Sequence, residues 1–362
     1  MNMRILYIAY PLLTVSEDSA GGAEQVLWTL EREMSRRGVE TTVAASAGSD
    51  VAGRLFVTGD PCSRTDAFER RNHDHQARIV ELVCHRRRAG AAFDLVHDMS
   101  GSFWPRAMEF DTPLLATLHL PRHFYPPHLF ENIPANVSFS CVSQTQAGTF
   151  HSLGALAGVV ANGIALDRFA LSVDKGGEKP RGLLWLGRIC EEKAPHLALE
   201  IAQRSGVSIT LAGQVYPFSY HQNYFEEEVI PRLQQIPGAT FLSAPSAQTK
   251  RRLLRQAQAV LITSQVEETS SLVAMEAAAS GTPVIAFARG ALQEIVRDGV
   301  TGFLIENVEE AARAVRRLGE IDPEACVRHT HQHFSGSTMA EKYCELYQQA
   351  RSSGLTLAPT EL

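Results

Sequence analysis

The sequence predicts an α/β protein made of two Rossmann-like, doubly wound domains. Short apolar runs of strand type alternate with helical segments along nearly the whole chain. The Gly-rich, charged segment 174–181 interrupts this alternation and is typical of a linker. At 362 residues, the chain is also longer than one hydrophobic core usually supports. We therefore expect a first domain at 1–172 and a second at 180–335, facing each other across a cleft.

The first domain begins with a buried strand at 4–10, and a polar loop then leads to Gly21 and Gly22. A helix at 23–37 follows and ends at Gly38, a residue type common just past helix ends. Strands that alternate with helices in this way form a parallel sheet. Further strands are expected at 39–45, 94–98, 114–119 and 138–142, and a further helix around 76–88.

The second domain shows the same alternation of strands and helices. Its strands are expected at 183–186, 208–212, 240–242, 259–264 and 284–288. Its helices are expected at 195–205, 224–235, 249–256 and 270–280. A last helix at 337–351 is amphipathic, and we expect its apolar face to pack back on the first domain. That face carries Met339, Tyr343, Leu346 and Tyr347.

The composition argues against several functional classes. A formal net charge of −6 argues against nucleic acid as the main partner. The six cysteines are scattered without CxxC spacing, so we expect reduced thiols and a cytoplasmic location. No stretch approaches the ~20 apolar residues of a membrane-spanning helix, so at most peripheral membrane contact is expected. His329, His331 and His333 alternate in a segment that is more typical of a solvent-exposed helix than of a metal site, so no metal site is expected.

Glu268 and Glu276 flank the point where a buried strand turns into a helix. The Ala-rich helix that follows Glu268 and carries Glu276 is stopped by Gly281 and Pro283, directly before the next strand. Open parallel sheets bind ligands at the carboxyl ends of their strands, and a helix start offers free N–H groups to a diphosphate. A helix rises about 12 Å over eight residues, so one carboxylate can meet a sugar and the other a ribose. The pair therefore indicates a nucleotide-sugar site.

Arg188 and Lys193 follow the first strand of the second domain. Arginine offers a forked donor and lysine a point charge, so together they can clamp a diphosphate. They would also neutralise the charge that grows on a departing nucleoside diphosphate. A simpler interpretation, surface ion pairs with Glu191 and Glu192, stays open.

The first domain contributes Gly21 and Gly22 before a helix and His119 just past a strand. Two glycines let the backbone approach an anionic group, and a histidine there can donate to a sugar hydroxyl. An ordinary loop with a helix start and a structural histidine are the alternatives. The glycines do not form a GxGxxG fingerprint, which argues against a hydride-transfer enzyme.

Together these segments resemble the retaining glycosyltransferases of family 4, members of the glycosyl transferases group 1 with the GT-B fold. The resemblance covers nearly the whole chain, and the combination of motifs is more specific than any one of them. The matching residues, in the family's order, are Gly21-Gly22-Ala23-Glu24, Thr117-Leu118-His119, Val142-Ser143, 161–169, Gly187-Arg188 with Lys193, Glu268 with Glu276, 280–284 and 298–304.

The resemblance implies transfer of a hexose-type sugar from a nucleotide-diphosphate sugar, of UDP or GDP type, with the anomeric configuration kept. In the family, the residues matching Arg188 and Lys193 hold the donor diphosphate, and the glutamate matching Glu276 binds the ribose. The glutamate matching Glu268 contacts the donor sugar, and the histidine matching His119 lies beside it.

The glycines matching Gly21 and Gly22 approach the phosphates from the other domain in the family. The usual proposal there is a same-face reaction in which the leaving phosphate helps to deprotonate the acceptor. Neither a metal nor a cofactor other than the donor is implied. We expect closure about the linker near Asp174 to assemble the site.

One departure from the family lies after the first glutamate. Where the family commonly has Gly-Phe-Gly, this chain has Thr269, Ser270 and Ser271, followed by Leu272. Their backbone N–H groups remain available, and their hydroxyls can cap the helix or bond a phosphate. The preference for a donor sugar is therefore open. The aromatic segment 214–228 either shapes the base pocket or is a packed surface loop.

Two alternatives to a transferase share this architecture. One is a nucleotide-sugar epimerase, which would form product without an acceptor. The other is a catalytically degenerate partner that binds the sugar nucleotide. For a transferase, the acceptor can be a small molecule, a glycan or a lipid-linked sugar, because the loops that would line its site vary too freely to predict a ligand.

Overall fold

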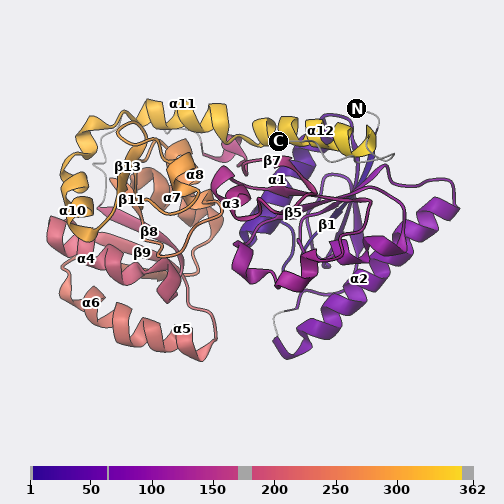
Figure 1. Ribbon diagram of the computed structural model, residues 1–362. Coiled ribbons are helices and arrows are strands. Elements are labelled where there is room, and N and C mark those ends of the chain that lie inside the picture. The colour runs from indigo at the N-terminus through magenta and orange to yellow at the C-terminus, as the bar shows by residue number, and fades with distance from the viewer. Residues whose placement is uncertain (1–2, 63–64, 170–181, 353–362) are drawn as a thin grey trace. The chain divides into compact units, whose positions relative to one another are not determined.

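The computed structural model describes residues 3–62, 65–169 and 182–352 (Figure 1). It divides into two compact units, Met1–Gly163 with Gly336–Leu362, and Ile164–Ser335. The expected linker around Asp174 and the expected domain limits at 172 and 180 lie outside the described residues.

The first unit is built on a seven-stranded parallel sheet with the strand order β3-β2-β1-β4-β5-β6-β7. The direction in which strands are added reverses between β1 and β4, the arrangement of a doubly wound sheet. The strands are β1 (Arg4–Ile8), β2 (Glu40–Ala45), β3 (Arg54–Val57), β4 (Leu95–Asp98), β5 (Leu114–Leu118), β6 (Val137–Cys141) and β7 (Leu156–Val159). Of these, β3 and β7 are not predicted from the sequence.

Four α-helices belong to the described part of this unit: α1 (Gly22–Arg36), α2 (Thr65–Arg88), α3 (Gln144–Thr149) and α12 (Gly336–Ser352). Short 3-10 turns span Trp104–Glu109, Arg122–Phe124 and Pro127–Phe130. The predicted apolar face of the last helix is buried, and α12 packs beside α1 (Figure 1). α12 therefore completes the core of the first unit.

A buried polar network holds α12 to the sheet. The His97 imidazole, on β4, lies 2.7 Å from the Tyr347 hydroxyl through Nδ1 and 2.8 Å from the Thr117 hydroxyl through Nε2. The Thr117 hydroxyl in turn lies 3.0 Å from that of Tyr343. Burial lowers the pKa of His97 to about 3, so its ring is neutral at neutral pH. Each ring nitrogen therefore has a hydrogen-bond partner, as a buried polar group requires.

The second unit has a six-stranded parallel sheet with the strand order β10-β9-β8-β11-β12-β13. Here the reversal lies between β8 and β11, which pair directly. The strands are β8 (Leu183–Arg188), β9 (Ile209–Gln214), β10 (Thr240–Ser243), β11 (Ala259–Ile262), β12 (Val284–Phe287) and β13 (Gly302–Ile305). The predicted class, two Rossmann-like doubly wound sheets, is confirmed; the cleft between them stays a prediction.

Helices cover the second sheet in two groups. α4 contacts α10, whereas α8 contacts α7 and α11 (Figure 1). α4 and α8 lead away from the reversal in opposite directions, so right-handed crossovers place them on opposite faces of the sheet. The α-helices are α4 (Pro195–Ser205), α5 (Ser219–Tyr224), α6 (Ile230–Gln235), α7 (Ala247–Gln256), α8 (Leu272–Ala279), α9 (Leu292–Ile295), α10 (Val308–Arg316) and α11 (Pro323–His333). Shorter helical turns span Leu166–Arg168, Glu191–Lys193, Phe225–Val229 and Leu318–Glu320.

The helix predicted at 224–235 begins earlier than expected. It starts at Ser219, after the extended residue Phe218, and contains a π-helical turn at Phe225–Val229. Pro231 lies just past this turn and has no N–H to donate to the preceding turn. The wider turn accommodates this proline, so the helix continues through it.

None of the described helices is long and apolar enough to cross a membrane. All six cysteines are free thiols.

Candidate functional site

The predicted site residues of the second unit gather at one edge of its sheet. Arg188 is the last residue of β8, and the loop after β11 leads to Glu268. Since β8 and β11 are parallel neighbours at the reversal of strand order, this edge is where open α/β sheets bind ligands. The residues of this group are Arg188, Lys193, Glu268, Thr269, Ser270, Ser271, Leu272 and Glu276.

Lys193 and Glu268 form an ion pair through Nζ and Oε1. The side chain of Glu268 is only 10% exposed and that of Lys193 is 27% exposed. The lysine thus compensates the charge of a carboxylate that is largely removed from water. The simpler interpretation, an ion pair of Lys193 with its sequence neighbours, does not describe this geometry.

Buried hydrogen bonds fix the turn that carries Lys193. Thr263 lies just past β11. Its hydroxyl donates to two carbonyl oxygens, that of Ala194 at 2.8 Å and that of Lys193 at 3.0 Å. The same hydroxyl accepts from the indole N–H of Trp185 at 3.0 Å. Ala194 has a left-handed backbone with φ of 47°, which is costly for a residue with a Cβ atom. Thr263 therefore holds a strained turn in the position that brings Lys193 to Glu268.

The backbone at Glu268 is held by the loop after β12. The N–H of Ala291 donates to the carbonyl oxygen of Glu268 at 2.7 Å. Gly290 has φ of 54°, and a Cβ atom there would lie 2.3 Å from the same oxygen. This loop therefore needs glycine both for its backbone angle and for its close approach.

Ser270 and Ser271, which stand where the family commonly has Phe-Gly, have different roles at the start of α8. The Ser271 hydroxyl accepts from the N–H of Ala274 at 3.3 Å and caps the helix. The Ser270 hydroxyl is buried and has no hydrogen-bond partner in the described residues. With the free N–H groups of the helix start, it provides hydrogen-bond donors for an anionic group.

Glu276 lies one turn further along α8 and is almost fully buried. Its Oε1 accepts from Nζ of Lys250, on α7, at 2.6 Å, and its side chain is only 4% exposed. Its Oε2 is buried without a hydrogen-bond partner in the described part of the chain. A carboxylate in this state still has one oxygen able to accept a hydrogen bond from a ligand. Lys250 is a residue that the sequence reasoning missed.

Arg188 is more exposed than the other cation of this group. Its nearest carboxylate is that of Glu192, at 3.9 Å, and both side chains are about half exposed. The largely buried His221, on α5, has its pKa lowered by burial and further by the charge of Arg188. The aromatic segment after β9 is thus near enough to Arg188 for the charge of the arginine to act on His221. Whether this segment shapes a base pocket stays a prediction.

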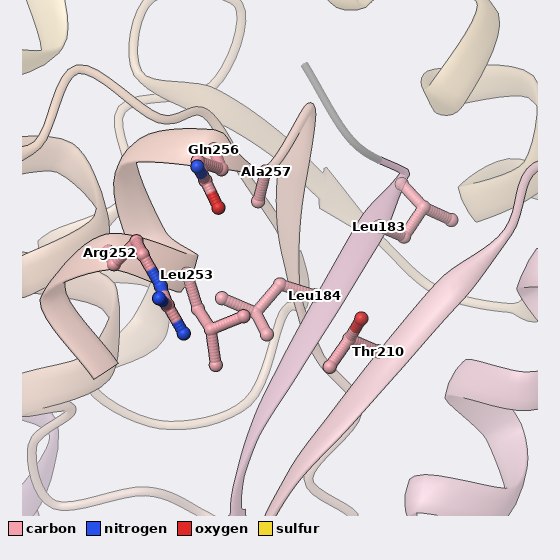
Figure 2. Close-up of a pocket in the computed structure, with 7 residues that line it drawn as sticks. All are labelled: Leu183, Leu184, Thr210, Arg252, Leu253, Gln256 and Ala257. Atoms are coloured by element: carbon pink, nitrogen blue, oxygen red, sulfur yellow. The ribbon is translucent and has the colours of Figure 1, made fainter. Parts of the chain in front are cut away.

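A cavity of about 410 Å³ in the second unit lies away from these residues (Figure 2). Leu183 and Leu184 line it from the first residues of β8, and Thr210 lines it from β9. Arg252 and Gln256 point toward it from α7 (Figure 2). The cavity is therefore at the amino end of the strands, whereas the charged pairs lie at the carboxyl end. We locate the candidate site by the charged pairs, because ligands of such sheets bind at the carboxyl end.

In the first unit, Gly21 and Gly22 begin α1, and Glu24 lies over them. A Cβ atom at Gly21 would lie 1.9 Å from Oε2 of Glu24. Glu24 is buried, and burial raises the pKa of its carboxyl group. The close approach at position 21 is thus made by the end of a side chain of the same helix. The predicted contact of these glycines with a phosphate stays a prediction.

His119 directly follows β5, and burial lowers its pKa to about 4, so its ring is neutral at neutral pH. The side-chain amide of Gln146 holds the backbone on both sides of His119. It donates to the carbonyl oxygens of Leu118 at 2.8 Å and Leu120 at 2.9 Å. The Ser143 hydroxyl accepts from the N–H of Gln146 at 3.2 Å and caps α3. His119 is therefore held at the carboxyl edge of its sheet, and its role beside a sugar stays a prediction.

Residues 172–331, which include every candidate residue of the second unit, match the family Glycosyl transferases group 1. The match lies within the second unit and covers less than half of the chain, and we call residues 172–331 the glycosyl transferase segment. The glycosyl transferase segment contains both charged pairs and the start of α8.

Two relatives of this chain are also named glycosyltransferases. The D-inositol 3-phosphate glycosyltransferase of Streptomyces scabiei is 28% identical in an alignment of 268 positions, which covers 63% of this chain and 60% of that protein. The protein of the same name from Geodermatophilus obscurus is 32% identical in an alignment of 178 positions, which covers 44% of this chain and 39% of that protein. The matches thus span less than two thirds of either relative.

Solved structures share the fold at low identity. AviGT4, a glycosyltransferase involved in avilamycin A biosynthesis, has a TM-score of 0.72 at 21% identity, covering 97% of this chain and 98% of its own. Alr3699/HepE of Anabaena, solved with UDP and glucose, has a TM-score of 0.73 at 18% identity, covering 96% and 100%. At these identities the likeness establishes the fold alone. The glycosyltransferase fold expected from the sequence, with two Rossmann-like sheets, is therefore confirmed.

Proposed function

We propose that this protein is a retaining hexosyltransferase of family 4 that uses a nucleotide-diphosphate sugar of UDP or GDP type. The observation that carries the proposal is a pair of glutamates, one in the loop before α8 and one in the middle of that helix, each paired with a lysine. The partly exposed Glu268 is paired with Lys193, and the buried Glu276 is paired with Lys250. Carboxylates for hydroxyl groups and cations for phosphates are what a sugar nucleotide requires.

In the proposed complex, the donor diphosphate lies at the start of α8. There Arg188, Lys193 and the free N–H groups of the helix neutralise its charge. Oε2 of Glu276 accepts a hydrogen bond from the ribose, and Glu268 contacts the donor sugar. The partly buried, neutral His119 donates to a sugar hydroxyl, and Gly21 and Gly22 approach the phosphates.

In the proposed reaction, the bond between the anomeric carbon and the diphosphate oxygen breaks. The acceptor oxygen forms its bond to the same face of that carbon, and its proton passes to the departing phosphate. Arg188 and Lys193 stabilise the negative charge that grows on the leaving group. The scheme uses neither a protein nucleophile nor a metal. Burial raises the pKa of the nearby Cys190 thiol, so this group is not an activated nucleophile either.

The relatives named above support a transferase. Alr3699/HepE was solved with UDP-glucose, and a starch synthase with ADP and acarbose, which supports a nucleotide-sugar partner. We propose a small-molecule, glycan or lipid-linked acceptor. We also propose a cytoplasmic location with at most peripheral membrane contact, which the free cysteines support.

The test is release of nucleoside diphosphate from UDP- and GDP-hexoses with a mixed panel of acceptors. Transfer with retention, observed by NMR of the new anomeric proton, is the expected result. Conversion of the donor to its epimer without an acceptor would show that the protein is an epimerase and not a transferase. Donor binding without turnover against any acceptor would indicate a degenerate partner.

A further inference from the structure

Lys250 is paired with the buried carboxylate of the candidate site, and it lies on a helix that carries none of the motifs by which the chain resembles family 4. It is located on α7, which contacts α8, and its Nζ is 2.6 Å from Oε1 of Glu276. The Lys250 side chain is 22% exposed, whereas that of Glu276 is 4% exposed. The contact is therefore between a lysine at the edge of the site and a carboxylate inside it.

Burial of Leu254 and one hydrogen bond to the residue after α8 hold α7 beside that helix. Leu254, one turn after Lys250 on the same face of the helix, is fully buried. The buried hydroxyl of Thr282, which follows α8, donates to the carbonyl oxygen of Leu254 at 2.5 Å. At the other end, the Ser246 hydroxyl accepts from the N–H of Thr249 at 3.2 Å and caps α7. The position of Lys250 is thus set by the fold of α7.

The arrangement leaves one defined acceptor in the site. Lys250 occupies Oε1 of Glu276, while Oε2 is buried and has no hydrogen-bond partner in the described residues. A buried charged oxygen without a donor is unfavourable, so this oxygen suits a ligand hydroxyl. The ion pair also limits which way the carboxylate can turn.

We propose that Lys250 is a positioning residue for the donor nucleotide, which holds Glu276 so that Oε2 accepts from a ribose hydroxyl. The inference rests on the proposed function and adds to it the residue that makes recognition of the ribose specific. Lys250 acts through Glu276, so its removal affects the ribose contact and leaves the diphosphate contacts of Arg188 and Lys193 in place.

The experiment compares each ribonucleoside diphosphate, UDP and GDP, with its 2′,3′-dideoxy form by calorimetric titration. We expect the wild-type protein to bind the preferred ribonucleotide at least about tenfold more tightly than the dideoxy form, the value of one charge-assisted hydrogen bond. We expect Lys250→Met to remove most of this ratio and Lys250→Arg to restore it. Arg255→Met changes an exposed cation on the same helix and should leave the ratio unchanged.

A further variant guards against misfolding caused by an unpaired buried carboxylate. In Lys250→Met/Glu276→Gln the uncompensated charge is absent, and the ratio should equal that of Glu276→Gln alone. If the wild-type protein prefers the ribonucleotide and Lys250→Met keeps the full preference, the inference is overturned and the proposed function stands. If the wild-type protein binds neither nucleotide, the proposed function itself is overturned.

Discussion

Gly290 packs against the backbone of Glu268 so closely that a Cβ atom at position 290 would lie 2.3 Å from the Glu268 carbonyl oxygen and 2.7 Å from its nitrogen. The loop after β12 therefore supports the loop after β11 from behind. A residue that touches no predicted ligand thus determines where a candidate sugar-binding carboxylate lies.

Gly290→Ala should displace the backbone of Glu268 and weaken donor binding. Its matched control is Gly299→Ala, because Gly299 has a similar φ of 69° but no atom within 4 Å of an added Cβ. The control should lose about 1 kcal/mol of unfolding free energy from backbone strain alone. Gly290→Ala should lose more and also bind donor more weakly, as measured by denaturant unfolding and nucleotide titration. Equal effects of the two substitutions would show that the close contact is unimportant.

Glu268→Gln should reduce turnover far more than stability. The substitution keeps the shape of the side chain but removes the charge that pairs with Lys193 and faces the proposed donor sugar. We expect turnover to fall at least about a hundredfold and the unfolding free energy to change by about 1 kcal/mol, since Lys193 is partly solvated. Glu267→Gln alters the exposed neighbouring carboxylate and is the control. Unchanged turnover in Glu268→Gln would remove Glu268 from the site.

Tyr347→Phe should destabilise the first unit. The substitution removes the hydroxyl that lies 2.7 Å from Nδ1 of the fully buried His97. The unpaired ring nitrogen should lower the unfolding free energy by about 1–3 kcal/mol. Tyr220→Phe, at a tyrosine that is 63% exposed, should have little effect in the same denaturation experiment. Equal stability of the two variants would argue against a role for the network in holding α12.

The first unit should lose stability in mild acid. Burial lowers the pKa of His97 to about 3 and those of His75 and His119 to about 4, against 6.5 for ordinary histidine. Below pH 6.5 the unfolded chain takes up protons that the folded unit does not bind until its own lower pKa values are reached. The unfolding free energy should therefore fall between pH 6.5 and about 4, by up to ~1.4 kcal/mol per pH unit for each histidine.

The check is chemical denaturation at several pH values for the wild-type protein and His97→Gln. The variant should show a shallower fall between pH 6.5 and 4, whatever its stability at neutral pH. Between pH 7 and 8 the unfolding free energies of the two proteins should change with pH in parallel, because these histidines are then neutral in both the folded and the unfolded protein. Equal slopes below pH 6.5 would contradict the assignment of His97 as a buried neutral group.

Where the backbone preferences of residues at its two ends determine a helix, the sequence predicts the bounds of that helix closely. The helix expected at 195–205 is α4, which has Pro195 in its first turn and Gly206 at its end with φ of 69°. These are the two residue types whose backbone preferences start and stop helices. Glu268 and Glu276 are found near a helix start for the same reason, because strand, loop and helix follow one another directly.

Features that depend on packing are not predictable in this way. The strand β3 (Arg54–Val57) lies at the sheet edge and is partly exposed, and its three consecutive apolar residues are too short a run to indicate a strand. Lys250 lies in a run of basic residues, and nothing in that run distinguishes it from Arg251 or Arg252. Only the contact between α7 and α8 brings it to Glu276, and that contact joins residues 26 positions apart in sequence.

The most direct test of the central claim is thermal stabilisation by a panel of nucleoside diphosphates and their sugars, in the wild-type protein and in Glu276→Ala. A ligand that binds only the folded state adds about 2.7 kcal/mol at 100 times its Kd. We predict a clear preference for one nucleotide in the wild-type protein and loss of that stabilisation in Glu276→Ala. No stabilisation by any nucleotide, or equal stabilisation of the variant, would contradict a nucleotide-sugar site at the start of α8.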